Sequence, residues 1–127
     1  EATFEMYLAV VESKTAALFA AATQAGAIVA GADARSEEAM RSFGRNLGVA
    51  FQLVDDALDY SGREQSLGKS VGDDFREGKM TLPVVYAFDR AGEPDRDFWR
   101  RTIAEGRQRP GDFERACELI AATRALE

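Results

Sequence analysis

The chain has 127 residues, of which 46% are hydrophobic and 30% charged, a composition typical of a folded domain and unlike that of a disordered or collagen-like chain. Its formal net charge of −6 argues against a nucleic-acid-binding protein, because such a protein needs a basic surface. The sequence has no histidine and a single cysteine, which excludes Ser-His or Cys-His nucleophile pairs, His-ligated zinc and an internal disulfide. Any chemistry must therefore come from carboxylates, lysines and bound metal.

The first predicted helix covers residues 3–31 and has no clear polar face after Thr15. A helix that is apolar on all sides normally buries itself among several others, and its alanines and Gly26 predict a close approach of its neighbours. Residues 16–32 lack the Leu, Ile and Val density of a membrane span, and no signal-peptide pattern opens the chain. We therefore expect a cytoplasmic protein without a membrane span. We also expect that the chain is cut at both ends and that part of the molecule is missing from this sequence.

A second helix is predicted from its N-cap at Ser36 to about Tyr60. It carries apolar residues at three- and four-residue spacing, namely Phe43, Leu47, Phe51, Val54 and Leu58. Residues 61–79 contain four glycines and little periodicity, so they are interpreted as a long ordered loop, and loops of that length in compact domains are usually functional.

Three shorter helices follow, over residues 81–91, 95–105 and 112–125. Thr81, Asp95 and Asp112 are their predicted N-caps, and Pro83 suits the first turn of the first of them. The last two helices are expected to pack through Phe98, Trp99, Ile103, Phe113, Leu119 and Ile120. No strand pattern occurs, so the predicted fold class is all-α.

The second predicted helix ends in a cluster of carboxylates. Asp55 and Asp59 are four residues apart and Asp56 and Asp59 three, so all three share one helix surface. Like charges at this spacing, near a helix C-terminus, are unfavourable unless a cation binds them. Oxygen ligands in small number suit Mg²⁺ shared with substrate phosphates. A solvated acidic helix end is the alternative interpretation.

Lysines accompany these aspartates. Lys14, followed by Thr15, interrupts the apolar first helix, and Lys69 and Lys79 flank Asp73 and Asp74 in the predicted loop. Each lysine alone would commonly be a solvated surface charge. Together with the three aspartates they suggest a metal-bridged diphosphate site, with metal on the carboxylates and ammonium groups on the phosphate oxygens.

The motif order KT, FQxxDDxxD, GKxxGxD and K resembles the C-terminal part of the trans-isoprenyl diphosphate synthases, the polyprenyl synthetase family. The resemblance implies an antiparallel helical bundle of the isoprenoid synthase type, with residues 1–127 as the C-terminal part of a single all-helical domain. The segments RTIAEG and GDFERA favour the long-chain members, of the octaprenyl or decaprenyl type.

The resemblance also implies roles for individual residues. Asp55 would be the principal Mg²⁺ ligand, supported by Asp56 and Asp59, partly through water. Asp74 would contact the metal-binding side chains without touching the metal. The allylic diphosphate would be held by Lys14 and Lys69, with Lys79 nearby. Thr15 and Gln52 would face the developing allylic cation.

The activity implied is that of a head-to-tail prenyltransferase. It would condense an allylic diphosphate with isopentenyl diphosphate through Mg²⁺-assisted ionisation and release diphosphate, and the enzyme would be a homodimer. The family's first aspartate-rich motif and its isopentenyl diphosphate site are not found in this sequence, so the chain alone is expected to be inactive.

Two alternatives remain. A terpene cyclase shares the fold and the chemistry, but it tends to carry N/D-D-x-x-S-x-x-x-E here, and that pattern would place Asp59 at the serine and Arg63 at the glutamate. A non-catalytic regulatory subunit of a heteromeric prenyl synthase would keep the fold without the chemistry. The intact aspartates and lysines disfavour it, because a binding-only role has no use for like charges held together.

Overall fold

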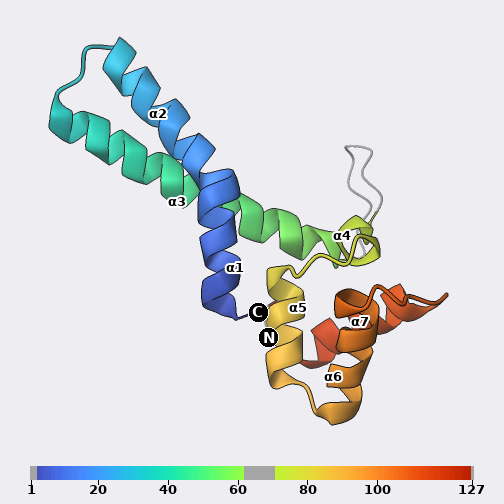
Figure 1. Ribbon diagram of the computed structural model, residues 1–127. Helices are drawn as coiled ribbons and strands as arrows, with labels where there is room; N and C mark the ends of the chain where they lie inside the picture. Colours follow the sequence, from blue (N-terminus) through green and yellow to red (C-terminus); the bar gives the residue numbers. More distant parts are fainter. Residues whose placement is uncertain (1–2, 62–70, 127) are drawn as a thin grey trace. The chain divides into compact units, whose positions relative to one another are not determined.

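The computed structural model describes residues 3–61 and 71–126, and within these ranges every regular element is helical. The predicted all-α fold class is thereby confirmed. The chain divides into two compact units, which we call the hairpin unit (Glu5–Val54) and the C-terminal unit (Glu1–Phe4 with Asp55–Glu127) (Figure 1). None of the helices described for residues 3–61 and 71–126 combines the length and the apolar character that crossing a bilayer requires.

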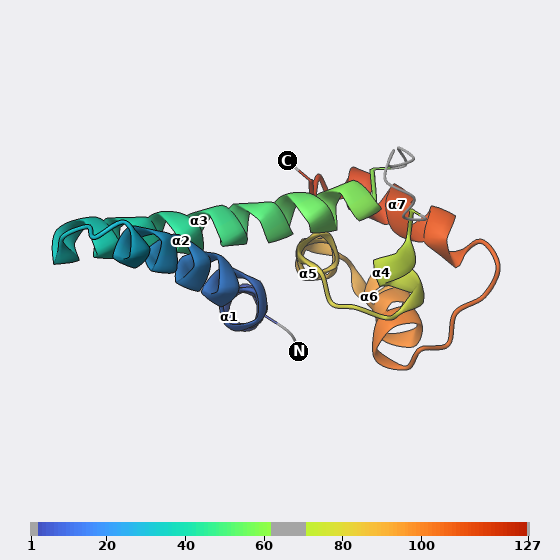
Figure 2. The same cartoon turned by 90° about the horizontal axis from the view of Figure 1, so that it is seen from above.

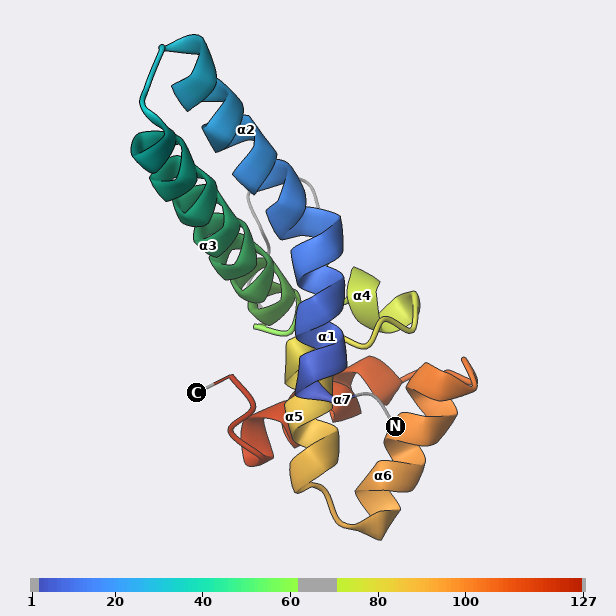
Figure 3. The ribbon, with the colours of Figure 1, turned by 60° about the vertical axis from the view of Figure 1, so that its left-hand side comes forward.

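The hairpin unit consists of two long helical runs. The first contains α1 (Phe4–Val11), a π-helical turn η1 (Glu12–Ala16) and α2 (Ala17–Val29). The second is α3 (Ala34–Asp59), which begins in this unit and lies beside α2 (Figures 1 and 3). The helix predicted over residues 3–31 is present, but one turn of it is π-helical.

Close packing between the two runs depends on glycines of α3. A Cβ atom at Gly44 would lie 2.5 Å from the carbonyl oxygen of Phe19, and one at Gly48 would lie 2.7 Å from the Cα of Ala16. By contrast, a Cβ at Gly26 would meet nothing within 4 Å, so the close approach predicted for Gly26 is wrong. The four-residue spacing of Gly44 and Gly48 puts both on one face of α3, where the backbones can come together.

The N-terminus of α3 is capped by Asp33 and not, as predicted, by Ser36. The Asp33 carboxylate accepts the backbone N–H of Ser36 at 2.8 Å, and the Asp33 carbonyl accepts that of Glu37 at 2.9 Å. Asp and Ser are nearly equivalent N-caps, so local preference could not choose between two candidates three residues apart.

Much of the apolar surface of the hairpin unit is exposed. On α2, Leu18 is 71% and Val29 89% exposed. The apolar stripe of α3 is exposed as well, at Met40, Phe43, Leu47, Phe51 and Val54. Exposed apolar surface on neighbouring helices usually marks a face that packs against other parts of a protein or against a partner.

The C-terminal unit has a core of its own, built by α4 (Asp73–Arg76), α5 (Leu82–Arg90), α6 (Glu93–Trp99), a second π-helical turn η2 (Arg100–Ala104) and α7 (Asp112–Ala122) (Figure 2). The buried residues of the core are Tyr60, Phe75, Val84, Ala87, Trp99, Ile103, Ala116, Leu119, Ile120 and Ala125, with Phe98 and Phe113 packed against them. The predicted packing of the last two helices through their apolar side chains is confirmed.

Several predicted boundaries in this unit were wrong. The segment interpreted as a loop over 61–79 contains the short helix α4, while residues 62–70 lie outside the described residues. Neither Asp95 nor Asp112 is an N-cap, because Gly92 and Gly111 occupy those positions. Helix α6 starts two residues before Asp95 because proline, here the second residue of α6, fits a first turn, where its missing N–H costs nothing.

Candidate active site

Thr15 and Gln52, both predicted site residues, are in direct contact within the hairpin unit. The Thr15 hydroxyl, on η1, donates to the side-chain oxygen of Gln52, on α3, at 2.9 Å, and both side chains are half-buried. Lys14 precedes Thr15 in the same π-helical turn and is exposed. π-helical turns are rare, and those that occur inside α-helices are frequently found at functional sites.

The three aspartates at the end of α3 have different surroundings. Asp56 is only 2% exposed, and its carboxylate lies 3.4 Å from the backbone nitrogen of Leu82, at the start of α5. The positive end of α5 therefore faces a buried negative charge. Thr81 occupies the predicted N-cap position of α5, but its side chain makes no capping bond. Asp55 is half-buried.

Asp59 is tied to the segment that leads into α4. Its two carboxylate oxygens accept backbone N–H groups of Gly72, at 3.2 Å, and of Asp74, at 3.0 Å. Burial raises the pKa of Asp59, and the nearby charge of Asp74 adds to this, while the two N–H groups oppose it. Gly72 has a φ of 86°, and a Cβ there would lie 2.7 Å from ring atoms of Phe113, so the position requires glycine twice over.

Asp74 and Lys79 form an ion pair across the same turn. The Lys79 ammonium lies 2.9 Å from the Asp74 carboxylate and 2.7 Å from that of Glu77. These two carboxylates raise the pKa of Lys79, so its ammonium stays charged at neutral pH. The Lys79 side chain remains 50% exposed, whereas that of Asp74 is 14% exposed. A sheltered carboxylate thus holds a lysine that can still reach solvent.

A metal ion at the end of α3 would need ligands besides the described carboxylates, such as substrate phosphates or water. Within residues 3–61 and 71–126, no group of three acidic side chains could hold a metal ion. Mg²⁺ is usually held by one or two carboxylates together with substrate phosphates and water, so a three-carboxylate cage is not needed. Lys69 lies outside the described residues. That Lys14 and Asp55 line the same site stays a prediction.

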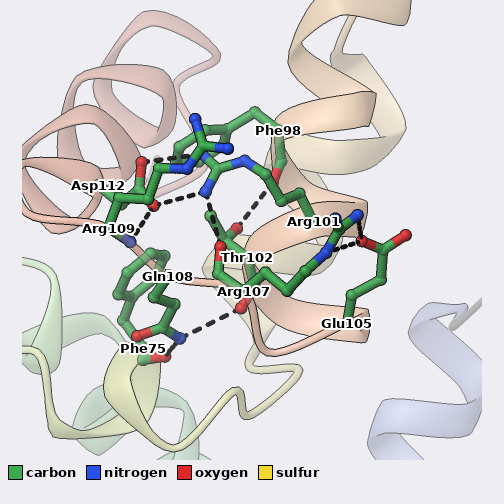
Figure 4. Close-up of polar contacts among 9 residues, drawn as sticks. All are labelled: Phe75, Phe98, Arg101, Thr102, Glu105, Arg107, Gln108, Arg109 and Asp112. Atoms are coloured by element: carbon green, nitrogen blue, oxygen red, sulfur yellow. Dashed lines mark hydrogen bonds and ion pairs between the residues drawn. The ribbon is translucent and has the colours of Figure 1, made fainter.

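A polar cluster beside α4 contains contacts that were not predicted from the sequence. In it, Arg101 pairs with Asp112, and the side chain of Gln108 donates to the backbone carbonyl of Phe75 (Figure 4). Gln108 stands in an irregular segment with neither periodicity nor a motif, so the sequence carried no signal that would have pointed to it.

Residues 1–120 match the Polyprenyl synthetase family. The chain therefore belongs to this family, as the resemblance of its motifs implied.

Two curated relatives and one solved structure show how closely the chain follows particular members. It is 50% identical over 103 residues to the octaprenyl diphosphate synthase of Haemophilus influenzae, covering 81% of this chain and 31% of that protein. It is 52% identical over 97 residues to the short chain isoprenyl diphosphate synthase of Methanothermobacter thermautotrophicus, covering 76% of this chain and 30% of that one. The crystal structure of polyprenyl synthase from Caulobacter crescentus, complexed with calcium and isoprenyl diphosphate, superposes with a TM-score of 0.91 at 52% identity over 98% of this chain and 38% of that chain.

The predicted similarity to long-chain members is thereby confirmed, although a short-chain member is equally similar. The chain spans about a third of the length of these relatives.

Proposed function

We propose that this chain forms one part of the active site of a polyprenyl diphosphate synthase, a head-to-tail prenyltransferase that joins an allylic diphosphate to isopentenyl diphosphate. The observation that carries the proposal is the polar group at the end of α3, where Asp59 receives backbone N–H groups of the turn that also bears the Asp74–Lys79 pair. The Caulobacter crescentus relative was crystallised with calcium and isoprenyl diphosphate, which supports the binding of a divalent cation and of a prenyl diphosphate.

In this proposal the carboxylates of α3 bind the divalent cation that accompanies the diphosphate. Asp55 is the principal ligand, and Asp56 and Asp59 support it. Asp56 accepts the backbone N–H of Leu82, and Asp59 accepts those of Gly72 and Asp74. When bound, Mg²⁺ supplies electrostatic stabilisation of the diphosphate leaving group. The lysines at 14, 69 and 79 hold the phosphate oxygens that the metal does not reach.

Thr15 and Gln52 would stabilise the hydrocarbon end of the substrate. Because the Thr15 proton is donated to Gln52, the hydroxyl offers its lone pairs to whatever lies on its other side. Oxygen lone pairs that are fixed in advance stabilise an allylic cation without reorganisation.

No step of the proposed reaction needs a histidine. The C–O bond of the allylic diphosphate breaks and its electrons leave with the diphosphate. The alkene of isopentenyl diphosphate then supplies the electron pair of the new C–C bond, and the resulting cation loses a proton to the released diphosphate. The protein groups bind, orient and exclude water, so that water does not trap the cation.

An assay of the full-length protein tests the proposal. Incubation with isopentenyl diphosphate, farnesyl diphosphate and Mg²⁺, followed by mass spectrometry, should yield longer prenyl diphosphates and free diphosphate. We expect products of octaprenyl or decaprenyl length, a cytoplasmic homodimer and no turnover by the 127-residue chain alone.

Cyclic hydrocarbon formed without consumption of isopentenyl diphosphate would indicate a terpene cyclase. The absence of Mg²⁺-dependent diphosphate binding would favour a regulatory subunit.

The role of Lys79 has a test of its own. Replacing it by glutamine keeps much of the side-chain length but removes the charge, so the KM for the allylic diphosphate should rise about tenfold, as expected for the loss of one charge-assisted hydrogen bond. The matched control is Arg90→Gln, because Arg90 donates to the backbone carbonyls of Thr123 and Arg124 at the other end of α5. An unchanged KM in Lys79→Gln would contradict the assigned role.

A further inference from the structure

The segment between η2 and α7, residues 105–111, is clamped by an arginine–aspartate pair (Figure 4). Two parallel hydrogen bonds, of 2.8 and 2.9 Å, join the Arg101 guanidinium to the Asp112 carboxylate. Arg101 also donates to the Arg107 carbonyl at 2.7 Å, and Asp112 accepts the backbone N–H of Arg109 at 2.7 Å. The two charged side chains are only 21% and 12% exposed. The fork geometry therefore fixes the backbone on both sides of Gln108.

Gln108 points from this clamped segment toward α4. Its side-chain nitrogen lies 2.6 Å from the carbonyl oxygen of Phe75 and 3.1 Å from that of Thr102. Both partners are carbonyls, which only accept, so the amide must present its nitrogen to them. Phe75 is 2% and Thr102 0% exposed, which leaves little room for water to replace these bonds.

Phe75 belongs to the turn that carries the proposed site groups. The backbone N–H of its neighbour Asp74 donates to the Asp59 carboxylate, and the Asp74 carboxylate accepts from the Lys79 ammonium. The Phe75 carbonyl also accepts the N–H of Gly78, next to Lys79, at 3.0 Å. One carbonyl oxygen therefore links Gln108 to both ends of the turn.

We propose that Gln108 is a positioning residue of the active site, and that the Arg101–Asp112 pair holds it in place. By fixing the Phe75 carbonyl, Gln108 sets where the N–H of Asp74 meets Asp59 and where the Lys79 ammonium stands. This inference rests on the proposed function, since it assigns Gln108 to the same diphosphate site. It predicts that Gln108 acts on metal and diphosphate binding without touching either.

The first test measures the turn itself in the metal-free, full-length protein. Hydrogen–deuterium exchange of peptides covering residues 71–79 should be several-fold faster in Gln108→Met, which keeps the size of the side chain but removes both donors. Arg101→Lys should have a similar but smaller effect, because lysine lacks the two-pronged geometry. Arg100→Lys is the matched control, since Arg100 pairs with Glu93 and Asp97 on α6. Unchanged exchange at 71–79 in folded Gln108→Met and Arg101→Lys would overturn the proposal.

The second test separates positioning from general stability. In Gln108→Met, the Mg²⁺ concentration for half-maximal rate and the KM for the allylic diphosphate should rise roughly three- to tenfold, the range for losing one or two neutral hydrogen bonds. The kcat at saturation should change less. A lowered Tm with both constants unchanged would show a merely structural role and refute the inference.

If wild type forms no prenyl product, the proposed function fails. The positioning role of Gln108 is then tested by hydrogen–deuterium exchange in the presence of inorganic diphosphate and Mg²⁺. Slower exchange of 71–79 in wild type but not in Gln108→Met supports it, and equal slowing in both overturns it.

Discussion

Replacement of Gly72 by alanine should destabilise the protein through two separate costs. The residue has a φ of 86°, and left-handed backbone costs a residue with a side chain about 1–2 kcal/mol. The new Cβ would also lie 2.7 Å from the Phe113 ring, which is held by Tyr60 and Phe75 at centroid distances of 6.2 and 5.8 Å. Overpacking of this kind typically costs about 1–3 kcal/mol, so Gly72→Ala should lose about 2–5 kcal/mol in the free energy of unfolding.

Gly111 provides the matched control. Its φ is 88°, but a Cβ there would meet nothing within 4 Å, so Gly111→Ala should show only the backbone cost. Urea denaturation of the full-length variants gives both free energies, and their difference isolates the clash with Phe113. Combining Gly72→Ala with Phe113→Leu should recover part of that difference. If Gly72→Ala cost no more than Gly111→Ala, the packing argument would be refuted.

Two further predictions concern packing and pH. Gly48→Ala should cost about 1–3 kcal/mol in urea denaturation because its Cβ would meet the Ala16 backbone at 2.7 Å, whereas Gly26→Ala, with open space, should gain up to about 1 kcal/mol; equal effects would contradict the packing. The Arg101 side chain lowers the pKa of Asp112, so this carboxylate stabilises the fold above its unfolded pKa of about 4 and loses that contribution as the pH falls through its folded value. Thermal denaturation of Asp112→Asn should therefore show a lower Tm at pH 7 and a weaker loss of Tm below pH 4 than wild type, and parallel curves would contradict the pairing.

The all-α fold and the apolar packing of α6 and α7 could be predicted because the periodicity of apolar residues directly records which helix faces are buried. Caps and turns were less predictable. Asp33 and Ser36 are chemically equivalent candidates for an N-cap, and only the tertiary structure chose between them. The π-helical turn around Lys14 left no pattern, because the apolar character continues unchanged on both sides of it.

The candidate site residues were named from their types and spacing, and their roles stay predictions, whereas their arrangement could not be predicted from the sequence. The spacing of Asp55, Asp56 and Asp59 placed them on one helix surface, yet Asp56 faces the start of α5 and Asp59 the segment before α4. These contacts join segments 13 to 26 residues apart, which helix periodicity does not report. Gln108 was missed for the same reason, since its partner Phe75 is 33 positions away.

The central claim is that a carboxylate of α3 acts on a diphosphate through a divalent cation. The most direct measurement compares Mg²⁺-dependent kcat/KM of the full-length wild type with that of Asp55→Asn, using Asp89→Asn, an exposed position on α5, as the matched control. The account predicts a loss of roughly a hundredfold or more for Asp55→Asn, the scale on which a transition-state-stabilising group acts, and no change for the control. Activity of Asp55→Asn within threefold of wild type, at the same Mg²⁺ requirement, would contradict it.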